Sequence, residues 1–401
     1  MKKKILYYIH GSYVNGGAFL SAFEILKRLS EDNRFEVHVF IIKGANPEVK
    51  ETIETLGLNC QATSAWNFMI FGRSLIGWLS GSILKMCFHV VMDIIASLIN
   101  VYKFSCLVEK FDPDIIHFNS SVLLPLTFFT HKKNRKFVVH CREGIRPYYF
   151  TNIRYKIMNY LVSKVDKLIC ISPTEKNQFD LINRDEEKTI VVPNPIDNQI
   201  ISNIASVYSI NKDFTKIAIF GGYTPAKGAI EFLSSLKKIY SPFQVLFCGP
   251  EKGPSEYQKK VDKLILELEK KDNCVFTFCG LIKKPLSVIS ASDLVVVPHI
   301  MPHFSRVIIE SWSLKKPVIC FSDTFTDILD KQSYGALILS NKTIDNLALK
   351  IEELMKDPEL AKAKALKGKN YWEKNHKPKN VTNMVLDIYN DLKSEGGSAD
   401  E

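Results

Sequence analysis

One carboxylate, Glu310, stands in the middle of an otherwise apolar segment of the chain. This segment predicts a helix that begins near Phe304 and stops before Pro317, because proline cannot continue a helix. The apolar flanks at residues 294–298 and 318–321 predict buried parallel strands. Burying a carboxylate is costly unless something hydrogen-bonds it. Ligands of doubly wound sheets lie outside the carboxyl ends of the strands, where this helix starts, so Glu310 is a candidate ligand contact.

Glycines follow the first predicted strand in each half of the chain. Gly16 and Gly17 stand before a predicted helix, where paired glycines let backbone N–H groups approach an anion that the helix dipole also favours. This turn is neither a G-x-G-x-x-G fingerprint nor a P-loop, so a plain tight turn is the alternative. In the second half, Gly222 precedes Lys227, whose ammonium is a candidate phosphate ligand or a plain surface charge.

A histidine, His140, ends the apolar residues 137–140 and is followed by Arg142 and Glu143. Histidine can donate hydrogen bonds to ligand oxygens, which makes His140 a candidate functional residue. The alternative is that its ring only satisfies a loop carbonyl. Arg142 and Glu143 are further candidates for contact with a ligand.

The elements that must position these side chains alternate between strand and helix, which implies parallel sheets. With 401 residues the chain exceeds what a single core usually absorbs, so two domains are expected. The two alternating runs predict Rossmann-like domains with a hinge near residues 194–212 and a binding cleft between them. The predicted strands are residues 4–9, 37–42, 115–118, 137–140 and 168–171, then 216–220, 244–248, 275–278, 294–298 and 318–321.

The composition is that of a globular protein, because 46% of the residues are hydrophobic and 24% are charged, which excludes wholesale disorder. A formal net charge of +10 favours anionic partners, yet no segment carries a nucleic-acid-binding fingerprint, so no nucleic acid is expected. Nine cysteines without a Cys-x-x-Cys pair indicate a reducing compartment. The apolar residues 5–9 are too few for a signal peptide, so a cytoplasmic location is predicted.

Residues 66–104 are unusually rich in aromatic and aliphatic side chains. No uncharged run in them reaches the roughly 18 apolar residues of a membrane span. Two interpretations stay open. One is a pair of core helices that extend the first domain. The other is an in-plane membrane-binding element with Arg73 and Lys85 near lipid phosphates.

The segment around Glu310 resembles the pattern E-x-F-G-x-V-x-x-E-A-x-A-x-x-x-P-V-I of the retaining glycosyltransferases of family 4 (group 1). Phe304, Glu310 and residues 317–319 match this pattern, and so does Val307. Pro302 stands in place of its first glutamate, and Ser305 replaces its glycine.

A second segment resembles the family pattern G-R-x-x-x-x-K-G, in which arginine and lysine bind the donor diphosphate. Lys227 and Gly228 match it, and Gly222 occupies the arginine position. The resemblance implies that Glu310 binds the donor ribose, and that Gly16, Gly17 and His140 line the opposite wall. The implied catalytic residues are His140 and Lys227, the donor-binding residues are Glu310, Ser305, Arg306, Gly222, Gly16, Gly17, Leu281 and Ile282, and the acceptor contacts are Arg142 and Glu143.

The resemblance also implies the GT-B fold, an α/β architecture in which two Rossmann-like domains with parallel sheets face one another across a cleft. Residues 1–200 would form the acceptor-side domain and residues 212–379 the nucleotide-sugar-binding domain. The final helix, residues 380–393, would return to the first domain, and residues 394–401 would be a polar tail.

The implied activity is that of a retaining, metal-independent glycosyltransferase of the hexosyltransferase type, which needs no cofactor. It would move a sugar from a UDP- or GDP-linked donor to a hydroxyl of a saccharide or lipid-linked saccharide, for a surface polysaccharide, at the inner face of the cell membrane. Pro302 and Gly222 motivate one alternative, a non-catalytic scaffold in a polysaccharide assembly complex. Another is a sugar-nucleotide epimerase or a phosphorylase on the same fold.

Overall fold

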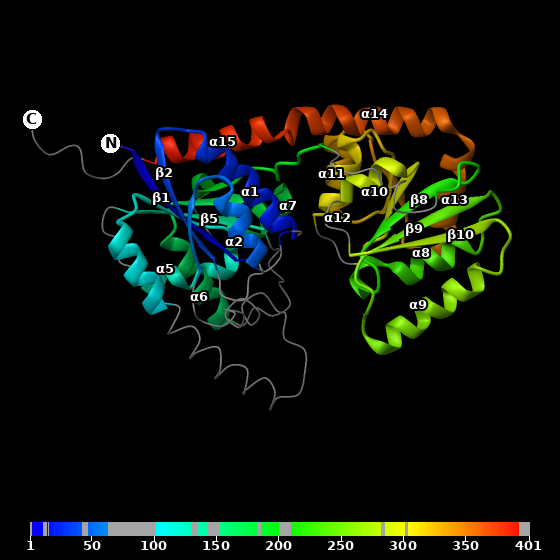
Figure 1. Cartoon of the computed structure of the whole chain (residues 1–401), viewed down its shortest axis with the longest axis horizontal. Helices are drawn as coiled ribbons and strands as arrows, with labels where there is room; N and C mark the ends of the chain where they lie inside the picture. The colour runs from blue at the N-terminus through cyan, green and yellow to red at the C-terminus, as the bar shows by residue number, and fades with distance from the viewer. Residues whose placement is uncertain are drawn as a thin grey trace, which may run out of the picture. The chain divides into compact units, whose positions relative to one another are not determined.

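The computed structural model describes residues 2–10, 14, 16–41, 47–62, 101–129, 135–142, 152–182, 186–199, 210–281, 285–300 and 304–392. The chain divides into two compact units (Figure 1). Unit 1 consists of Met1–Pro195 together with Pro378–Glu401, and unit 2 consists of Ile196–Lys377.

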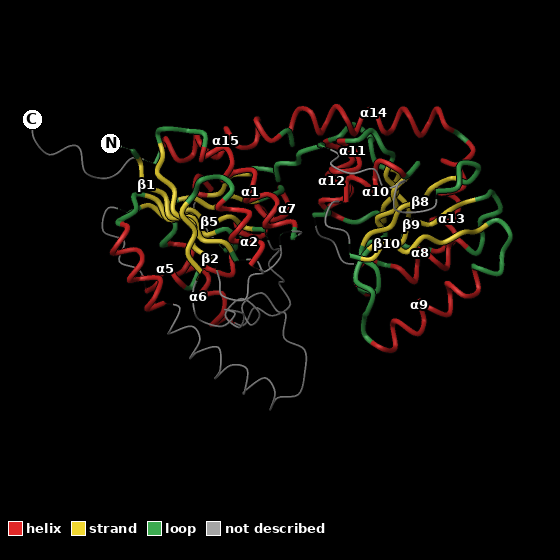
Figure 2. Tube along the Cα trace, viewed as in Figure 1, coloured by secondary structure: helices red, strands yellow, loops and turns green. Residues whose placement is uncertain are grey.

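Unit 1 is built on a seven-stranded sheet in the order β3-β2-β1-β4-β5-β6-β7, and all its strand pairs are parallel (Figure 2). The strands are β1 (Lys3–Ile9), β2 (Phe35–Ile41), β3 (Asn59–Ala62), β4 (Ile115–Phe118), β5 (Lys136–Cys141), β6 (Lys167–Cys170) and β7 (Thr189–Val191). The helices are α1 (Gly17–Ser30), α2 (Pro47–Glu54), η1 (Ser121–Leu123), α5 (Leu126–Phe129), α6 (Asn152–Ser163), α7 (Pro173–Asp180), η3 (Glu186–Lys188) and α15 (Pro378–Asp391), and residues 101–111 are also helical.

Both faces of this sheet are buried. Because side chains alternate along each strand, neighbouring residues of one strand lie on opposite faces. Leu6 and Tyr8 of β1 pack into one apolar cluster, whereas Tyr7 and Ile9 pack into a second cluster on the other face. Helix α15 covers the second cluster and lies against α1, which Figure 1 shows in red beside blue. The ammonium of Lys3 donates to the carbonyl of Tyr389 at 2.7 Å and so helps to hold the end of α15 on β1.

The apolar residues 66–104 fall almost entirely outside the described residues, and both interpretations of them remain predictions. Of this range the structure describes residues 101–104, which end with Phe104. Its ring is buried and lies 5.3 Å from the ring of Tyr8 and 5.7 Å from that of Phe118, between ring centroids. None of the helices in the described ranges combines the length and the apolarity that crossing a bilayer requires.

Unit 2 is built on a six-stranded sheet in the order β10-β9-β8-β11-β12-β13, again with parallel pairs. The predicted α/β class with two parallel sheets is therefore confirmed. The strands are β8 (Thr215–Phe220), β9 (Phe243–Cys248), β10 (Cys274–Gly280), β11 (Leu294–Val297), β12 (Val318–Phe321) and β13 (Ile338–Ser340). The helices are η5 (Pro225–Lys227), α8 (Ala229–Leu236), α9 (Ser255–Leu268), α10 (Pro285–Ala291), α11 (Arg306–Ser313), α12 (Thr324–Gln332), α13 (Ile344–Lys356) and α14 (Pro358–Asn375).

Strands β3, β7 and β13 were not predicted, and each lies at an edge of its sheet. They contain 4, 3 and 3 residues, and none of them is a run of four consecutive apolar residues, as VICF of β12 is and IIHF of β4 nearly is. Edge strands are also covered less completely than central ones, and β3 exposes Gln61 and Ala62. The long apolar runs that sequence patterns detect belong to the interior of a parallel sheet.

Helix α11 is held in place by Trp312, which is 0% exposed and packs against Gly368 of α14. A Cβ atom added to Gly368 would lie 2.2 Å from Cδ1 of Trp312. We expect Gly368→Ala to lower the free energy of unfolding by about 1–3 kcal/mol, because the overlap exceeds what alanine gains in helix propensity. Denaturant unfolding measures this loss. The exposed neighbour Lys367→Ala is the control, and equal stability of the two variants would contradict this packing.

Candidate functional site

Polar side chains gather at the carboxyl edge of the unit 1 sheet, where β1, β4 and β5 are neighbours. Asn119 follows β4, His140 lies near the end of β5, and Arg142 follows β5 directly. Asn119 and His140 are both 0% exposed. Sequence analysis did not identify Asn119, although a polar residue placed directly after a buried strand was the available signal.

The amide of Asn119 connects several of the predicted site residues. Its Oδ1 accepts hydrogen bonds from Nε and Nη2 of Arg142 at 2.9 and 2.8 Å, and from the Tyr7 hydroxyl at 3.1 Å. Its Nδ2 donates to the carbonyl of Ala18 at 3.3 Å. Ala18 lies in the first turn of α1, directly after Gly16 and Gly17. The start of α1 and Arg142 therefore meet at a single buried amide.

His140 is linked to the same group of residues through Arg142. Nη2 of Arg142 lies 3.3 Å from Nδ1 of His140, and Nη1 donates to Oδ1 of Asn194 at 2.6 Å. Burial, together with the positive charge of Arg142, holds the pKa of His140 well below its usual range, and His117 adds to this effect. His140 is therefore neutral at physiological pH.

A second buried histidine, His117 of β4, extends this network toward α15. Its ring stacks on that of Tyr7 with centroids 4.3 Å apart, and its Nδ1 lies 2.6 Å from the hydroxyl of Tyr389. Burial lowers the pKa of His117 and raises that of Tyr389, so both groups are neutral. The candidate acceptor contact Glu143 lies outside the described residues.

The predicted donor-binding residues of unit 2 gather at the carboxyl edge of its own sheet. Gly222 follows β8 and has φ 50°. A Cβ atom at this position would lie 2.6 Å from the carbonyl oxygen of Pro250. The position that corresponds to the family's arginine is therefore a tight backbone turn without room for a side chain.

Lys227 lies on the same turn, and its aliphatic chain covers Gly221, since a Cβ atom on Gly221 would lie 2.4 Å from Cβ of Lys227. Burial lowers the pKa of the Lys227 ammonium to about 8. Gly228, with φ 73°, packs so closely on the loop after β11 that an added Cβ atom would lie 1.9 Å from the carbonyl oxygen of Pro298. The Lys227 turn is thus fixed against the segment that leads to α11.

Glu310 is buried in α11, with 4% of its surface exposed. Its Oε1 accepts a hydrogen bond from Nε of Arg306 at 2.7 Å, one helical turn earlier. Ser305 is the N-terminal capping residue of α11 and is also buried, but its side chain does not bond to the helix. Two candidate donor contacts, Arg306 and Glu310, are therefore paired with each other.

The remaining predictions fall at the same edge or outside the described residues. Leu281 follows β10 at the carboxyl edge of the sheet and is 66% exposed. Ile282 and Pro302 lie outside the described residues. The structure thus places the described candidates in two groups, one at the carboxyl edge of each sheet.

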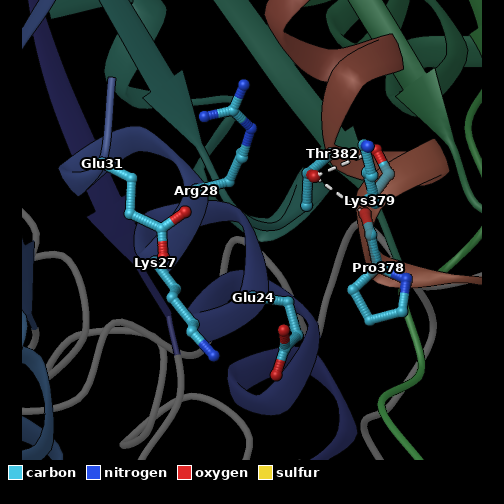
Figure 3. Close-up of a pocket in the computed structure, with 7 residues that line it drawn as sticks. All are labelled: Glu24, Lys27, Arg28, Glu31, Pro378, Lys379 and Thr382. Atoms are coloured by element: carbon cyan, nitrogen blue, oxygen red, sulfur yellow. Dashed lines mark hydrogen bonds between the residues drawn. The ribbon is translucent and has the colours of Figure 1, made fainter. Parts of the chain in front are cut away.

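A pocket of unit 1 lies away from the carboxyl edge of the unit 1 sheet, between the second half of α1 and the start of α15 (Figure 3). Its walls carry acidic and basic side chains at the surface, and the Thr382 hydroxyl donates to the carbonyl of Pro378 at 2.7 Å. None of the predicted site residues lines it. The lining residues are Glu24, Lys27, Arg28, Glu31, Pro378, Lys379 and Thr382.

Comparison with known families assigns each half of the chain. Residues 15–199 match the family model described as Glycosyltransferase Family 4, and residues 201–371 match the one described as Glycosyl transferases group 1. An uncharacterized glycosyltransferase of Methanocaldococcus jannaschii is 23% identical over 303 residues, which cover 70% of this chain and 78% of that protein.

Solved structures share the fold over almost the whole chain. HepE of Anabaena, in complex with UDP and glucose, superposes with a TM-score of 0.75 at 18% identity, over 97% of this chain and 100% of that one. Sucrose-phosphate synthase of Thermosynechococcus elongatus superposes with a TM-score of 0.72 at 16% identity, over 98% and 99% of the two chains. The predicted GT-B architecture is confirmed by these likenesses.

Proposed function

Since the chain belongs to the group 1 glycosyltransferases, with each half matching a model of these families, we propose that it is a retaining, metal-independent hexosyltransferase that uses a nucleotide-sugar donor. UDP-sugars are the first donors to consider, because HepE has been solved in complex with UDP and with UDP-glucose. GDP-sugars are the second choice. The base itself would be bound by backbone groups near Leu281. Backbone groups are the same for every residue type, so the sequence does not indicate which base they bind.

The observation that carries the proposal is the buried carboxylate of Glu310 at the carboxyl edge of the unit 2 sheet. Its two oxygens can accept hydrogen bonds from two ribose hydroxyls. On binding, these hydroxyls would take the place of the Arg306 guanidinium, which now lies 2.7 Å from Oε1. The released guanidinium would then bind the diphosphate, for which its fork of N–H donors is suited.

The chemical step would depend on stabilising the departing nucleoside diphosphate. The bond between the anomeric carbon and the diphosphate oxygen breaks, the acceptor hydroxyl bonds to that carbon on the same face, and its proton passes to the departing phosphate. Lys227, Arg306 and the N-terminus of α11 supply positive charge where negative charge develops. His140 would donate a hydrogen bond to the sugar.

The acceptor we propose is a saccharide or lipid-linked saccharide of a surface polysaccharide, reached by a cytoplasmic enzyme at the inner face of the membrane. The net charge of +10 and the apolar residues 66–104 support an encounter with an anionic lipid surface. A scaffold without donor binding is the second candidate, because Pro302 stands where the family pattern has glutamate.

The experiment that tests the function combines donor hydrolysis and transfer. The protein is incubated with UDP- and GDP-hexoses, with and without membrane extract that contains lipid-linked saccharides, in the presence of EDTA. We expect release of one nucleoside diphosphate, enhanced by the extract and unaffected by EDTA. A product formed without an acceptor would favour an epimerase, dependence on phosphate would favour a phosphorylase, and no reaction with any donor would favour the scaffold.

The pKa of Lys227 gives the proposal a pH dependence with a definite sign. A diphosphate binds the protonated ammonium, and this proton is lost as the pH rises through about 8. We expect UDP affinity to fall by up to about tenfold per pH unit above that point. Calorimetric titration with UDP between pH 7 and pH 9.5 measures the slope.

The control for this prediction is Lys227→Arg, whose guanidinium keeps its charge throughout this pH range. We expect its affinity for UDP to stay level where that of the wild type declines. The same decline in both proteins would show that another group titrates and that Lys227 does not bind the diphosphate.

A further inference from the structure

We propose that Arg142 is a positioning residue that fixes His140 as the tautomer with its proton on Nε2. The consequence for catalysis rests on the proposed function, whereas the tautomer itself can be observed without it. This role differs from the acceptor contact that the sequence suggested for Arg142.

The first step of the argument concerns hydrogen-bond direction. A guanidinium has only N–H donors and never accepts a hydrogen bond. Nη2 of Arg142 lies 3.3 Å from Nδ1 of His140, so Nδ1 must be the acceptor and carries no proton. A neutral imidazole holds one proton. In His140 that proton is therefore on Nε2.

The second step is that Arg142 is held firmly enough to impose this choice. Its Nε and Nη2 both donate to Oδ1 of Asn119, at 2.9 and 2.8 Å, and Nη1 donates to Oδ1 of Asn194 at 2.6 Å. Asn119 and Asn194 are both buried, with 0% and 6% of their surfaces exposed. A guanidinium fixed at three nitrogens is occupied within the protein and is poorly placed to bind an acceptor.

The third step concerns the far side of the imidazole ring. Nε2 of His140 is buried and has no hydrogen-bond partner among the described residues. A buried N–H donor without a partner is destabilising, and an incoming oxygen that accepts its hydrogen bond would remove this destabilisation. With the tautomer fixed, His140 presents a ready donor to a sugar hydroxyl or a phosphate oxygen. The opposite tautomer would present an acceptor there and repel a phosphate oxygen.

Burial, and after it the charges around the ring, lower the pKa of His140 and keep the ring neutral. The ionisable side chains of the described residues that act on His140 are Arg142, which follows the same strand, and His117 of the neighbouring β4, and both lower its pKa. Tyr7 and Tyr389, the other ionisable groups of this network, are neutral because burial raises the pKa of each. Removing the charge of Arg142 would therefore raise the pKa of His140 toward its usual value.

Asn119 extends this positioning to the first helix. Its Nδ2 bond to the carbonyl of Ala18 ties the Arg142 guanidinium to the first turn of α1. Arg142 thus sets the ring of His140 relative to Gly16 and Gly17, which are the other candidate contacts of unit 1.

The test is nitrogen NMR of the full-length protein labelled with ¹⁵N-histidine, recorded without substrate between pH 6 and pH 8. Imidazole nitrogens that carry a proton are separated in chemical shift from those that do not, and His140→Gln identifies the signals of this residue. In the wild type we expect protonated Nε2 and unprotonated Nδ1 at every pH. A proton on Nδ1, or equal averaging of both nitrogens, overturns the proposal even if every Arg142 variant fails to fold.

Three variants distinguish the effect of losing the charge of Arg142, the effect of losing its planar fork of donors, and a general destabilisation of the fold. In Arg142→Gln we expect the tautomers to mix and the titration midpoint of His140 to rise. Arg142→Lys keeps the positive charge but lacks the planar fork of donors. In this variant we expect the tautomers to mix and the titration midpoint of His140 to rise less than in Arg142→Gln. Arg135→Lys is the control, because Arg135 is a buried arginine just before the same strand and pairs with Asp112 at 2.8 Å. It should leave the His140 signals unchanged.

Kinetics complete the test. We expect Arg142→Gln to lower kcat by about tenfold or more with little change in the KM for the acceptor, since one hydrogen bond to the reacting sugar is lost. A rise in the acceptor KM with unchanged His140 signals would return Arg142 to the role of an acceptor contact. If no donor is turned over even by the wild type, the proposed function fails, while the NMR result still decides the tautomer.

Discussion

Replacing Glu310 by alanine is expected to reduce the affinity for UDP by at least about 100-fold. Two ribose hydroxyls would lose a charged acceptor, and each such hydrogen bond contributes about 1.5–3 kcal/mol, where about 1.4 kcal/mol is a factor of ten. The measurement is thermal unfolding with UDP at about 100 times the wild-type Kd. The wild type should gain roughly 2.7 kcal/mol from the ligand, and the variant close to nothing.

The same substitution also removes the carboxylate that pairs with Arg306 and leaves a mostly buried guanidinium beside the vacated position. The ligand-free variant should therefore unfold at a lower temperature. The double variant Arg306→Gln with Glu310→Gln restores a neutral pair and should recover much of the stability without recovering UDP binding. Glu353→Ala, which breaks the exposed Lys350–Glu353 pair of α13, is the control for losing a carboxylate. Unchanged UDP binding in Glu310→Ala would refute the donor site.

Introducing arginine at Gly222, as the family pattern would suggest, is expected to destabilise unit 2 instead of improving donor binding. The backbone has φ 50°, and a Cβ atom would lie 2.6 Å from the Pro250 carbonyl oxygen. The left-handed conformation costs a side chain about 1–2 kcal/mol, and the overlap adds about 1–3 kcal/mol. Denaturant unfolding should therefore show a loss of about 2–5 kcal/mol.

Gly57 provides the matched control, since it has φ 72° and no atom lies within 4 Å of an added Cβ. Gly57→Arg should lose only the conformational part, about 1–2 kcal/mol. If Gly222→Arg were as stable as Gly57→Arg and bound UDP more tightly, the turn would have room for the side chain. The absence of arginine would then be a true loss of a diphosphate ligand.

The sequence determined the architecture of the chain because a buried parallel strand is visible in the sequence as a short apolar run. Residues 216–220, 244–248, 294–298 and 318–321 are apolar without alternation, and all became central strands of unit 2. The edge strands β3, β7 and β13 were not predicted, since short and partly exposed strands do not form a clear run of apolar residues. Helix α11 ends at Ser313, before Pro317, as predicted, and Lys315 closes it in a left-handed conformation with φ 54°.

The sequence likewise indicated Glu310, Lys227 and His140 through their positions after strands or inside an apolar helix. Such signals are local, because each consists of a polar residue at a position where the surrounding apolar residues predict burial. They say which side chains are unusual, but not what each one contacts. The roles of these residues as donor or catalytic contacts remain predictions.

Tertiary structure alone decided the partners. Ala18, Asn119 and Arg142 are distant in sequence and meet only because β1, β4 and β5 are neighbours at one sheet edge. The left-handed turn at Gly222 depends on the approach of Pro250, and the low pKa of Lys227 depends on burial. Hydrogen bonds, close approaches and burial arise from long-range packing, which no local pattern of residue types records.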